Sequence, residues 1–382
     1  MKIYRPSEEH TRKTDKIFMI VFLIIFAMCF LPFLLKKAPE TKNTEINPDD
    51  NISSAETEAV PPPEDYFTVN DKKGIRLRYS DNSLSEITDE MISAEAVMLY
   101  DRNTGTVLYS KNADKILYPA STTKIVTACV ALRYMSPDTV ITAGSELNLI
   151  QPDSSLAYIG ENCQLTLEDA LYALLLPSGN DAAYIIAVNT ARSASGNSSM
   201  SDEEAVKYFS RLMNEEADEA GADQTNFCVP DGYHNPDHYT TAEDLLKIAV
   251  HSAKYPLIAE ICSQPDRETT IISGQGYYWE NGNLLVTANK YNLPFATGLK
   301  TGFTDEAGYC MAATAKDDSH DLVAVILNAP SLSGRYTDAS RLFWSVIDPV
   351  KLQESLVTTA ATTEAPAEPE AQNDEEAPVT EP

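Results

Sequence analysis

Residues 119–134 read PASTTKIVTACVALRY, a polar turn followed by a mainly apolar run. The apolar run predicts a helix that is buried on most sides and ends before Pro137. Ser121 and Lys124 are three residues apart, so their side chains share one face of this helix. A serine hydroxyl is a weak nucleophile until a base takes its proton, and no histidine lies near this motif. Lys124 is therefore the expected base, provided its amine is neutral; a helix-capping serine beside a solvated lysine is the alternative.

The motif Ser178-Gly179-Asn180 supplies further polar groups. An apolar helix and Pro177 precede it, so we expect these residues in a loop. The Ser178 hydroxyl can relay a proton between Lys124 and a leaving amine. The Asn180 amide can hold Lys124 in place and bind a peptide carbonyl of the substrate. Because these residue types also make ordinary turns, a simple turn is the alternative.

The third motif, Lys300-Thr301-Gly302, falls on a predicted strand. Gly302 has no side chain, which lets a substrate backbone approach and pair as an added strand. Lys300 supplies a positive charge that can lower the pKa of Lys124, and Thr301 can hydrogen-bond a carboxylate. An exposed strand with one lysine is the alternative. The order S-x-x-K, S-x-N, K-T-G along one chain is typical of serine acyl-transferases of the penicillin-binding and β-lactamase type.

Predicted strands flank a mostly helical middle of the chain. A β-hairpin is expected at 94–109. Helices are expected at 165–176, 181–188, 203–220, 241–251 and 334–347. Further strands are expected at 284–286, 299–303, 308–315 and 321–327. This order of elements predicts an α+β fold with an antiparallel sheet.

The sequence resembles the D-alanyl-D-alanine carboxypeptidases, which are the low-molecular-mass penicillin-binding proteins. The resemblance covers residues 92–347 and rests on PASTTK (119–124), SGNDA (178–182), KTGFTDEAGYC (300–310), Asp231-Gly232-Tyr233 and His238. It implies the fold of the penicillin-binding and β-lactamase enzymes, in which helices sandwich an antiparallel sheet beside a helical subdomain. The string Asp231-Gly232-Tyr233-His234 differs slightly from the Gly-Leu form that is usual in the family, and we interpret this difference as a change in packing.

The resemblance also implies a role for each motif residue. Ser121 is the acylated nucleophile and Lys124 the base, with Ser178 and Asn180 as proton relay and positioning groups. Substrate binding falls to Lys300, Thr301, Gly302, Phe303 and Arg335. By the same resemblance, the backbone N–H groups of Ser121 and Phe303 form the oxyanion hole. Arg335 grips the terminal carboxylate, a task that suits a forked guanidinium.

The implied activity is removal of the terminal D-Ala from peptidoglycan stem peptides through an acyl-enzyme on Ser121, with β-lactams as covalent inhibitors. A DD-endopeptidase acting on cross-links is an open alternative. A class A β-lactamase requires a Glu-x-x-Leu-Asn string after the second motif, whereas here Glu146-Leu147-Asn148 precedes it. A non-catalytic, membrane-tethered module that binds the wall or senses β-lactams is the remaining alternative, and the intact motifs argue against a decayed site.

The two ends of the chain differ from this catalytic region. Residues 17–35 (IFMIVFLIIFAMCFLPFLL) carry no charge, and at ~1.5 Å per residue they nearly span a ~30 Å hydrocarbon core. Basic residues precede them, which predicts a cytoplasmic N-terminus (1–16), an uncleaved single-pass signal anchor and an extracytoplasmic catalytic domain. A cleaved and secreted form is the alternative, although no small-x-small site follows. A flexible acidic stalk (36–91), the catalytic domain (92–348) and a disordered acidic tail (349–382) complete the predicted organisation.

Charge and cysteine content exclude several classes of partner. The formal net charge of −28 repels nucleic acid. Five cysteines outside the apolar run fit no zinc or C-x-x-C spacing, so buried free thiols are expected at Cys129, Cys163, Cys228, Cys262 and Cys310, with one disulfide among them as the alternative. His234 and His238 are four residues apart, but Pro236 breaks a helical presentation of the pair to a metal. We therefore expect no metal and no cofactor, and we expect His238 to fix a loop.

Overall fold

The computed structural model describes four stretches of the chain, residues 66–69, 72–75, 77–80 and 87–353. Every described residue belongs to the unit Pro61–Pro382. The predicted cytoplasmic segment, the predicted anchor at 17–35 and residues 354–382 of the predicted tail lie outside the described residues. Within the described stretches, no helix is long and apolar enough to cross a bilayer.

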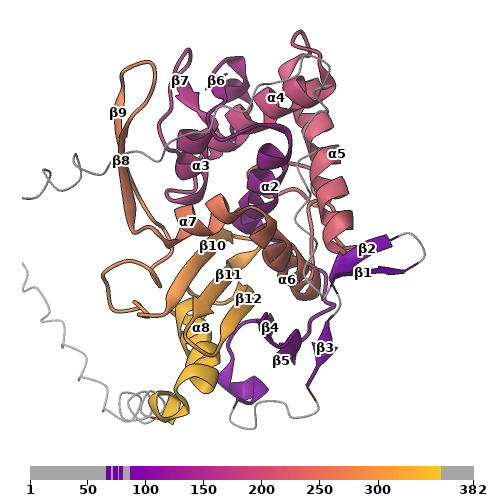
Figure 1. Cartoon of the computed structure of the whole chain (residues 1–382), viewed down its shortest axis with the longest axis vertical. Helices are drawn as coiled ribbons and strands as arrows, with labels where there is room; N and C mark the ends of the chain where they lie inside the picture. The colour runs from indigo at the N-terminus through magenta and orange to yellow at the C-terminus, as the bar shows by residue number, and fades with distance from the viewer. Residues whose placement is uncertain (1–65, 70–71, 76, 81–86, 354–382) are drawn as a thin grey trace, which may run out of the picture. The chain divides into compact units, whose positions relative to one another are not determined.

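A six-stranded sheet runs through this unit (Figure 1), with the strand order β10-β11-β12-β4-β5-β3. Neighbouring strands are antiparallel except for the short parallel pair of β3 and β5. The strands are β3 (Arg78–Tyr79), β4 (Ala96–Asp101), β5 (Thr106–Lys111), β10 (Ala296–Thr304), β11 (Gly308–Lys316) and β12 (Asp321–Ala329). The predicted hairpin at 94–109 and the predicted strands at 299–303, 308–315 and 321–327 are thereby confirmed.

The central strands are buried on both faces because helices cover each side of the sheet. Successive side chains of a strand point to opposite faces. In β4, Met98 packs in the larger core under α6 (Ala242–His251) and α7 (Pro256–Ser263), whereas Val97 and Leu99 pack in the smaller core with α8 (Leu332–Ile347). Each fully buried side chain of this kind stabilises the fold by about 1.5–3 kcal/mol. The sheet is therefore the middle layer of a sandwich, as the α+β prediction requires.

A helical subdomain lies beside the sheet (Figure 1). Its main helices are α2 (Lys124–Tyr134), α3 (Leu167–Leu175), α4 (Asn180–Ser195) and α5 (Asp202–Ala220). Side-chain and glycine caps set the ends of two of these helices: the Thr166 hydroxyl accepts from Asp169 N, and Gly221 ends α5 in a left-handed conformation at φ +84°. Ser201 and Glu204 add a capping box that sets the start of α5.

The remaining elements are short. They are β1 (Tyr66–Val69), β2 (Lys72–Ile75), β6 (Val140–Thr142), β7 (Gln164–Thr166), the hairpin of β8 (Asp266–Thr270) with β9 (Gly276–Glu280), and the 3-10 turns η1 (Asp89–Met91), η2 (Ala120–Thr123), η3 (Ser145–Leu149) and η4 (Ser252–Lys254). The predicted strand at 284–286 is wrong, because these residues form a turn. Two hydrogen bonds hold this turn: Asn283 Oδ1 accepts from Leu285 N, and Leu285 O accepts from Leu293 N.

The ordered domain extends past both predicted boundaries. β1, β2 and β3 fall within the predicted stalk, and β3 pairs with β5 of the main sheet. At the other end, residues 349–353 are helical and Leu352 is fully buried in the smaller core. The structure therefore differs from the predicted limits at 92 and 348, because short polar stretches carry single apolar residues that complete the core.

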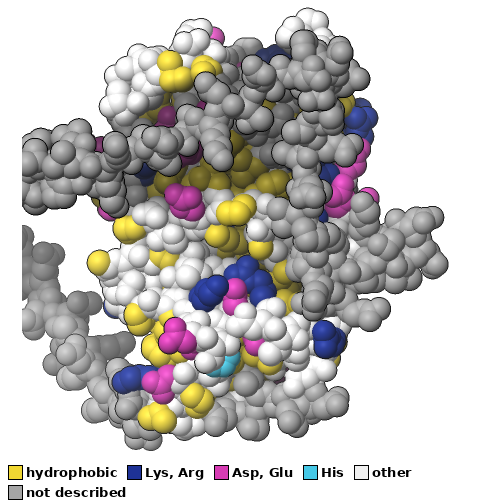
Figure 2. Space-filling model, in the orientation of Figure 1, with side chains coloured by type: hydrophobic (Ala, Val, Ile, Leu, Met, Phe, Trp, Pro, Cys, Tyr) yellow, Lys and Arg dark blue, Asp and Glu magenta, His cyan; other side chains and the backbone are white. Residues whose placement is uncertain are grey.

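Basic and acidic side chains lie next to one another on the face drawn in Figure 2. Near the middle of this view a few Lys and Arg side chains gather, with acidic side chains among and beside them. Among the described residues seen from this side, there is no broad basic surface of the kind that binds nucleic acid.

Candidate active site

The turn η2 and the first residue of α2 bring the predicted nucleophile and base together. Ser121 lies in the 3-10 turn, and α2 begins at Lys124. The helical spacing places Lys124 Nζ 2.9 Å from Ser121 Oγ. Thr122 and Thr123 fix the turn by donating to the carbonyls of Pro119 and Ala120, at 2.7 and 2.8 Å. The predicted pair is therefore confirmed as a hydrogen-bonded contact on one helical turn.

Three groups surround the Lys124 amine. Besides Ser121 Oγ, they are Asn180 Oδ1 at 2.7 Å and the backbone oxygen of Asp231 at 2.8 Å. The last two atoms only accept hydrogen bonds. A neutral amine has two N–H groups and one lone pair, so when it donates to both acceptors its lone pair faces the Ser121 hydroxyl. This geometry orients the neutral amine as a base toward Ser121.

Burial makes that neutral form accessible. Lys124 is 0% exposed, and desolvation lowers its pKa from 10.5 to about 8. The negative charges of Asp231 and Asp181 act in the opposite direction and favour the ammonium form. At neutral pH a fraction of Lys124 is thus uncharged and able to accept the Ser121 proton.

The second motif contributes Asn180 directly, while Ser178 lies beside it. Asn180 is the first residue of α4; its Oδ1 accepts from Lys124 and its Nδ2 donates to Ser154 Oγ at 2.9 Å. Ser178 adopts a left-handed conformation (φ +64°), and its carbonyl accepts from Ser155 Oγ at 2.6 Å. Within the described part of the chain, the Ser178 hydroxyl makes no hydrogen bond to Lys124, so its relay role stays a prediction.

The third motif, on β10, passes directly beside Ser121. A Cβ atom built on Gly302 would lie 2.8 Å from Ser121 N and 3.0 Å from Ala120 Cβ. Such distances are too short for any side chain, so only glycine allows the strand this close to η2. Phe303 follows on the same strand, is 48% exposed and lines the cavity at Ser121. The structure therefore places the Ser121 N–H and the 302–303 backbone at one edge, where the resemblance implied an oxyanion hole.

Lys300 is a buried amine, which the exposed-strand alternative did not anticipate. It is 2% exposed, and its Nζ donates to the Thr301 carbonyl at 2.9 Å. Burial, followed by the charge of Lys124, holds the pKa of Lys300 well below its usual range. Desolvation is the main cause of the lowered pKa at both amines, and the predicted lowering of the Lys124 pKa by the charge of Lys300 stays a prediction.

Arg335 lies against β10 rather than in the cavity lining. Its Nη1 donates to the carbonyls of Gly302 (3.1 Å) and Cys310 (3.2 Å), and its Nη2 donates to the Tyr336 hydroxyl at 3.2 Å. The residue is 5% exposed. These contacts tie α8 to the strand that carries the third motif. Its predicted grip on a substrate carboxylate stays a prediction.

A segment between α5 and α6 crosses the catalytic turn, and its contacts were largely missed from the sequence. Pro230 O accepts from Thr127 Oγ1 at 2.6 Å, directly before Asp231 O accepts from Lys124. Further along, His238 Nε2 lies 2.8 Å from Thr123 Oγ1. Burial lowers the pKa of His238 to about 3, so the imidazole is neutral. As expected, His238 fixes this loop.

Gly232 is the point of closest approach between this segment and η2. Its φ is +80°, and an added Cβ would lie 2.0 Å from the Ala120 carbonyl oxygen. We predict that Gly232→Ala lowers the free energy of unfolding by about 3 kcal/mol or more, because both the conformation and the space exclude a side chain. Gly196→Ala is the matched control, with φ +66° and nothing within 4 Å, and should cost about 1 kcal/mol. Equal losses in denaturant unfolding of the two variants would contradict this account.

A cavity of about 490 Å³ opens over Ser121. It is lined by Ser121, Asp153, Ser154, Ser155, Asn180, Gly232, Tyr233, His234, Phe303, Thr304, Asp305 and Glu306. The nucleophile and Asn180 thus lie in its wall, while the two lysine amines are buried behind them. Residues from all three motifs, far apart in the sequence, share this one cavity or touch its wall.

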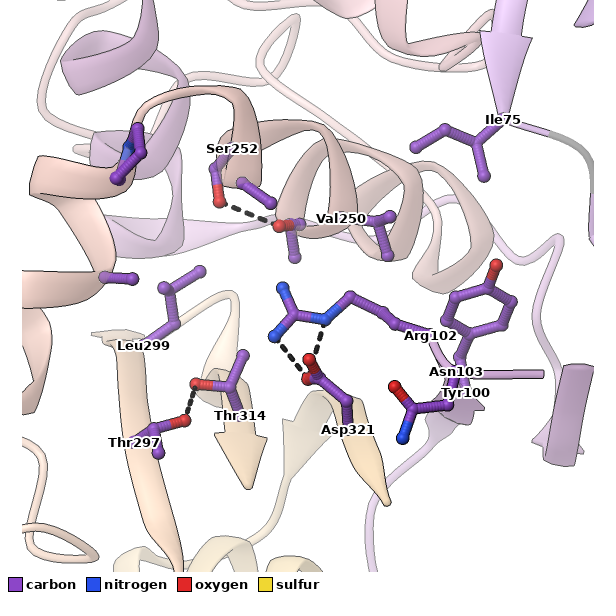
Figure 3. Close-up of a pocket in the computed structure, with 14 residues that line it drawn as sticks. Ile75, Tyr100, Arg102, Asn103, Val250, Ser252, Thr297, Leu299, Thr314 and Asp321 are labelled. Carbon is purple, nitrogen blue, oxygen red and sulfur yellow. Dashed lines mark hydrogen bonds and ion pairs between the residues drawn. The ribbon is translucent and has the colours of Figure 1, made fainter. Parts of the chain in front are cut away.

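A second cavity of about 450 Å³ lies between the sheet and the α6–α7 region (Figure 3). Figure 3 shows Arg102 paired with Asp321, the Arg102 Nε donating to Asp321 Oδ1 at 2.8 Å, and Thr297 bonded to Thr314 at 2.9 Å. Its charged groups neutralise one another, and none of its lining residues belongs to the Ser121 and Lys124 pair. The chemistry therefore favours the cavity at Ser121 as the active site.

Comparison with known proteins agrees with this assignment. Residues 83–331 match the D-alanyl-D-alanine carboxypeptidase family. The chain is 30% identical over 268 residues to D-alanyl-D-alanine carboxypeptidase DacA of Haemophilus influenzae, which covers 67% of this chain and 62% of that protein. It is 30% identical over 262 residues to a D-alanyl-D-alanine endopeptidase of Pseudomonas aeruginosa, covering 67% and 77%. The match thus spans less than two thirds of the length of DacA.

The fold is similar to that of solved relatives. The crystal structure of the Streptomyces K15 DD-transpeptidase matches with a TM-score of 0.61 at 29% identity, covering 68% of this chain and 98% of that one. The observed sheet, sandwiched by helices beside a helical subdomain, is the α+β fold of the penicillin-binding and β-lactamase enzymes. Because the family match includes all three motifs around the cavity, this chain belongs to the D-alanyl-D-alanine carboxypeptidase family.

Proposed function

We propose that this chain is a serine D-Ala-D-Ala carboxypeptidase, which removes the terminal D-Ala from peptidoglycan stem peptides through an acyl-enzyme on Ser121. The observation that carries the proposal is the contact of Lys124 Nζ with Ser121 Oγ at 2.9 Å. The other two partners of this amine only accept hydrogen bonds, so they direct the lone pair of the neutral amine toward the Ser121 hydroxyl. A buried amine with a pKa of about 8 is matched to general-base work near neutral pH.

The proposed reaction begins at the hydrogen-bonded pair of Ser121 and Lys124. Lys124 takes the Ser121 proton as Oγ attacks the carbonyl carbon of the penultimate D-Ala. The Ser121 and Phe303 N–H groups stabilise the oxyanion. The C–N bond then breaks, and the proton passes from Lys124 to the leaving D-Ala amine. Water hydrolyses the acyl-enzyme with the same amine as base.

Substrate positioning falls to the strand β10. In our proposal the stem peptide pairs along this strand, which Gly302 allows, while Lys300, Thr301 and Arg335 bind the terminal carboxylate. β-Lactams acylate the same hydroxyl and block it. Release of D-Ala from a pentapeptide ending in D-Ala-D-Ala is the direct test, and absence of release with a folded enzyme would overturn the assignment.

A DD-endopeptidase is the second candidate, favoured by the Pseudomonas aeruginosa relative that carries this name. A cross-linked dimeric muropeptide, assayed beside the pentapeptide, separates the two activities. Slow turnover of ampicillin under the same conditions separates both from a β-lactamase. A non-catalytic wall-binding or β-lactam-sensing module would show acylation by the drug but no turnover of either peptide.

The proposed base gives a pH dependence with a definite sign. Below its pKa, Lys124 is protonated and has no lone pair, so acylation of Ser121 should be slow. We predict that the second-order rate constant for labelling by a fluorescent penicillin rises with pH and reaches half of its maximum near pH 8. A rate constant that stays flat from about pH 6 to about pH 10 would exclude Lys124 as the base.

We also propose that residues 17–35 anchor the chain in the cell membrane with the catalytic domain outside. The uncharged apolar run and the basic residues before it support this topology. The acidic residues that follow would act as a stalk that holds the domain near the wall. N-terminal sequencing of membrane-extracted protein tests it, since a mature chain that starts after residue 35 would show cleavage and secretion instead.

A further inference from the structure

Asp231 is a fully buried carboxyl residue at the back of the catalytic pair. It is 0% exposed and lies between Pro230, which accepts from Thr127, and Gly232, which packs against η2. Its backbone oxygen accepts from Lys124 Nζ at 2.8 Å. The main chain of Asp231 therefore holds the proposed base directly, and the charge of its carboxyl group acts on the same amine.

One of the two carboxyl oxygens of Asp231 accepts a hydrogen bond, and the other has no partner within the described residues. Oδ1 accepts from Tyr233 N at 3.1 Å, while Oδ2 has no hydrogen-bond partner within the described residues. An unsatisfied buried carboxyl oxygen carries a desolvation cost, so packing alone gives no reason for an acidic residue here. Burial raises the pKa of Asp231, and the positive charge of Lys124 offsets only part of that rise.

Asp181, the other acid near Lys124, is used differently. Its Oδ1 accepts from Ala157 N and Ala182 N, and its Oδ2 accepts from Ile159 N. Both oxygens are thus committed to holding the loop before α3 against the start of α4. Asp231, in contrast, has one carboxyl oxygen that accepts no hydrogen bond within the described residues, so this oxygen can interact with the positive charge that develops on Lys124.

We propose that Asp231 is a positioning residue for the acyl transfer, whose carboxylate stabilises the Lys124 ammonium formed when the amine takes the Ser121 proton. This inference rests on the proposed serine peptidase chemistry. In that step the Oγ–H bond breaks, a bond forms from Oγ to the carbonyl carbon, and the proton resides on Nζ until it passes to the leaving amine. A nearby fixed anion stabilises that transient cation without touching the substrate.

The other charged or titratable groups around Lys124 do not substitute for this role. From β10, Lys300 can carry only a positive charge, which would oppose the ammonium and not stabilise it. From α4, both oxygens of Asp181 are already hydrogen-bonded, and burial, followed by the negative charge of Asp231, raises the pKa of the Tyr184 phenol. Of the acids facing the amine, Asp231 alone retains an unbonded carboxyl oxygen within the described residues.

The test is the isosteric variant Asp231→Asn, which keeps an acceptor for Tyr233 N and removes the charge. The measurement is the rate constant for acylation by a fluorescent penicillin across pH. Loss of the negative charge lowers the pKa of Lys124. The pH at which the acylation rate constant reaches half of its maximum should therefore fall by about one unit. The high-pH plateau should fall about tenfold, because the ammonium is less stabilised.

Asp338→Asn is the matched control. Asp338 is also a 0% exposed acid, but it binds Ser93 and Ala94 at the other core and should change stability without moving the pH profile. An Asp231→Asn profile that superimposes on the wild type, or that falls uniformly at all pH values, overturns the inference. If that variant does not fold, Asp231→Ser can still accept from Tyr233 N and should show the same shift.

Failure of this inference is distinguishable from failure of the proposed function. A wild-type enzyme that penicillin never labels refutes the serine acyl-transfer mechanism itself. A wild-type enzyme that is labelled, together with an unshifted Asp231→Asn profile, leaves that mechanism intact and refutes only the role of Asp231.

Discussion

Replacing Ser121 with alanine should abolish covalent labelling by penicillin and reduce D-Ala release by at least about 10³-fold. The reason is chemical: alanine has no atom that can carry the acyl group, whereas the cavity and the buried lysines remain in place. Mass spectrometry of the wild type after exposure to penicillin should show one adduct on the peptide that contains Ser121. The same digest of Ser121→Ala should show none.

The control for this variant is a serine outside the cavity. Ser136 is exposed, and within the described residues its side chain hydrogen-bonds Asp138 and Thr139 in the turn after α2, so Ser136→Ala should keep full labelling and turnover. Ser121→Ala removes one of the three hydrogen-bond partners of Lys124 Nζ and leaves the other two in place. The thermal unfolding of this variant should therefore resemble that of the wild type. An adduct on any other residue of Ser121→Ala would show that the nucleophile is misassigned.

Local sequence rules identified the catalytic pair because both residues lie on one helical turn. A spacing of three residues is enough to predict contact between Ser121 and Lys124, whatever the rest of the fold does. The same holds for caps such as Thr166, where a side chain satisfies a backbone N–H two or three residues away. Such contacts depend on short stretches, so the sequence contains the whole explanation.

Contacts made by backbone atoms escaped prediction for the opposite reason. Any residue type can offer the carbonyl that Asp231 presents to Lys124, and the meeting depends on how the 227–238 segment crosses η2. Ser154, which orients the Asn180 amide, lies in a loop with no periodic pattern. Burial of Lys300 is likewise a property of the assembled sheet and helices, and the lysine itself favours exposure.

The errors in secondary structure have a related cause. Leu284, Leu285 and Val286 form an apolar run that fits a strand, but neighbouring asparagine side chains satisfy the backbone and make a turn of it. The β8–β9 hairpin was missed because its strands, DRETT and GYYWE, mix charged and aromatic residues instead of alternating cleanly. One face of that hairpin is held by Trp279, which donates to the Ala157 carbonyl at 3.1 Å. This tertiary contact between Trp279 and Ala157 explains why residues 276–280 form the strand β9.

Replacing Lys124 with methionine should reduce acylation of Ser121 by about 10²–10⁴-fold, the range that general-base catalysis supplies. Methionine is of similar length and apolar, so it suits a site that is 0% exposed. It leaves Ser121 in place but removes the lone pair that faces the hydroxyl. The rate constant for penicillin labelling, measured on protein whose circular dichroism matches the wild type, reports this loss.

Lys124→Arg separates the need for a base from the need for a charge. Arginine restores the positive charge but does not lose its proton at accessible pH, so it should be as inactive as methionine. Neither variant should regain activity as the pH is raised, whereas the wild-type rate rises toward its plateau. Substantial labelling of either folded variant, increasing with pH, would mean that another amine takes the proton. Lys300 would then be the candidate, because it is buried, has a lowered pKa and lies close enough to Lys124 for the two charges to interact.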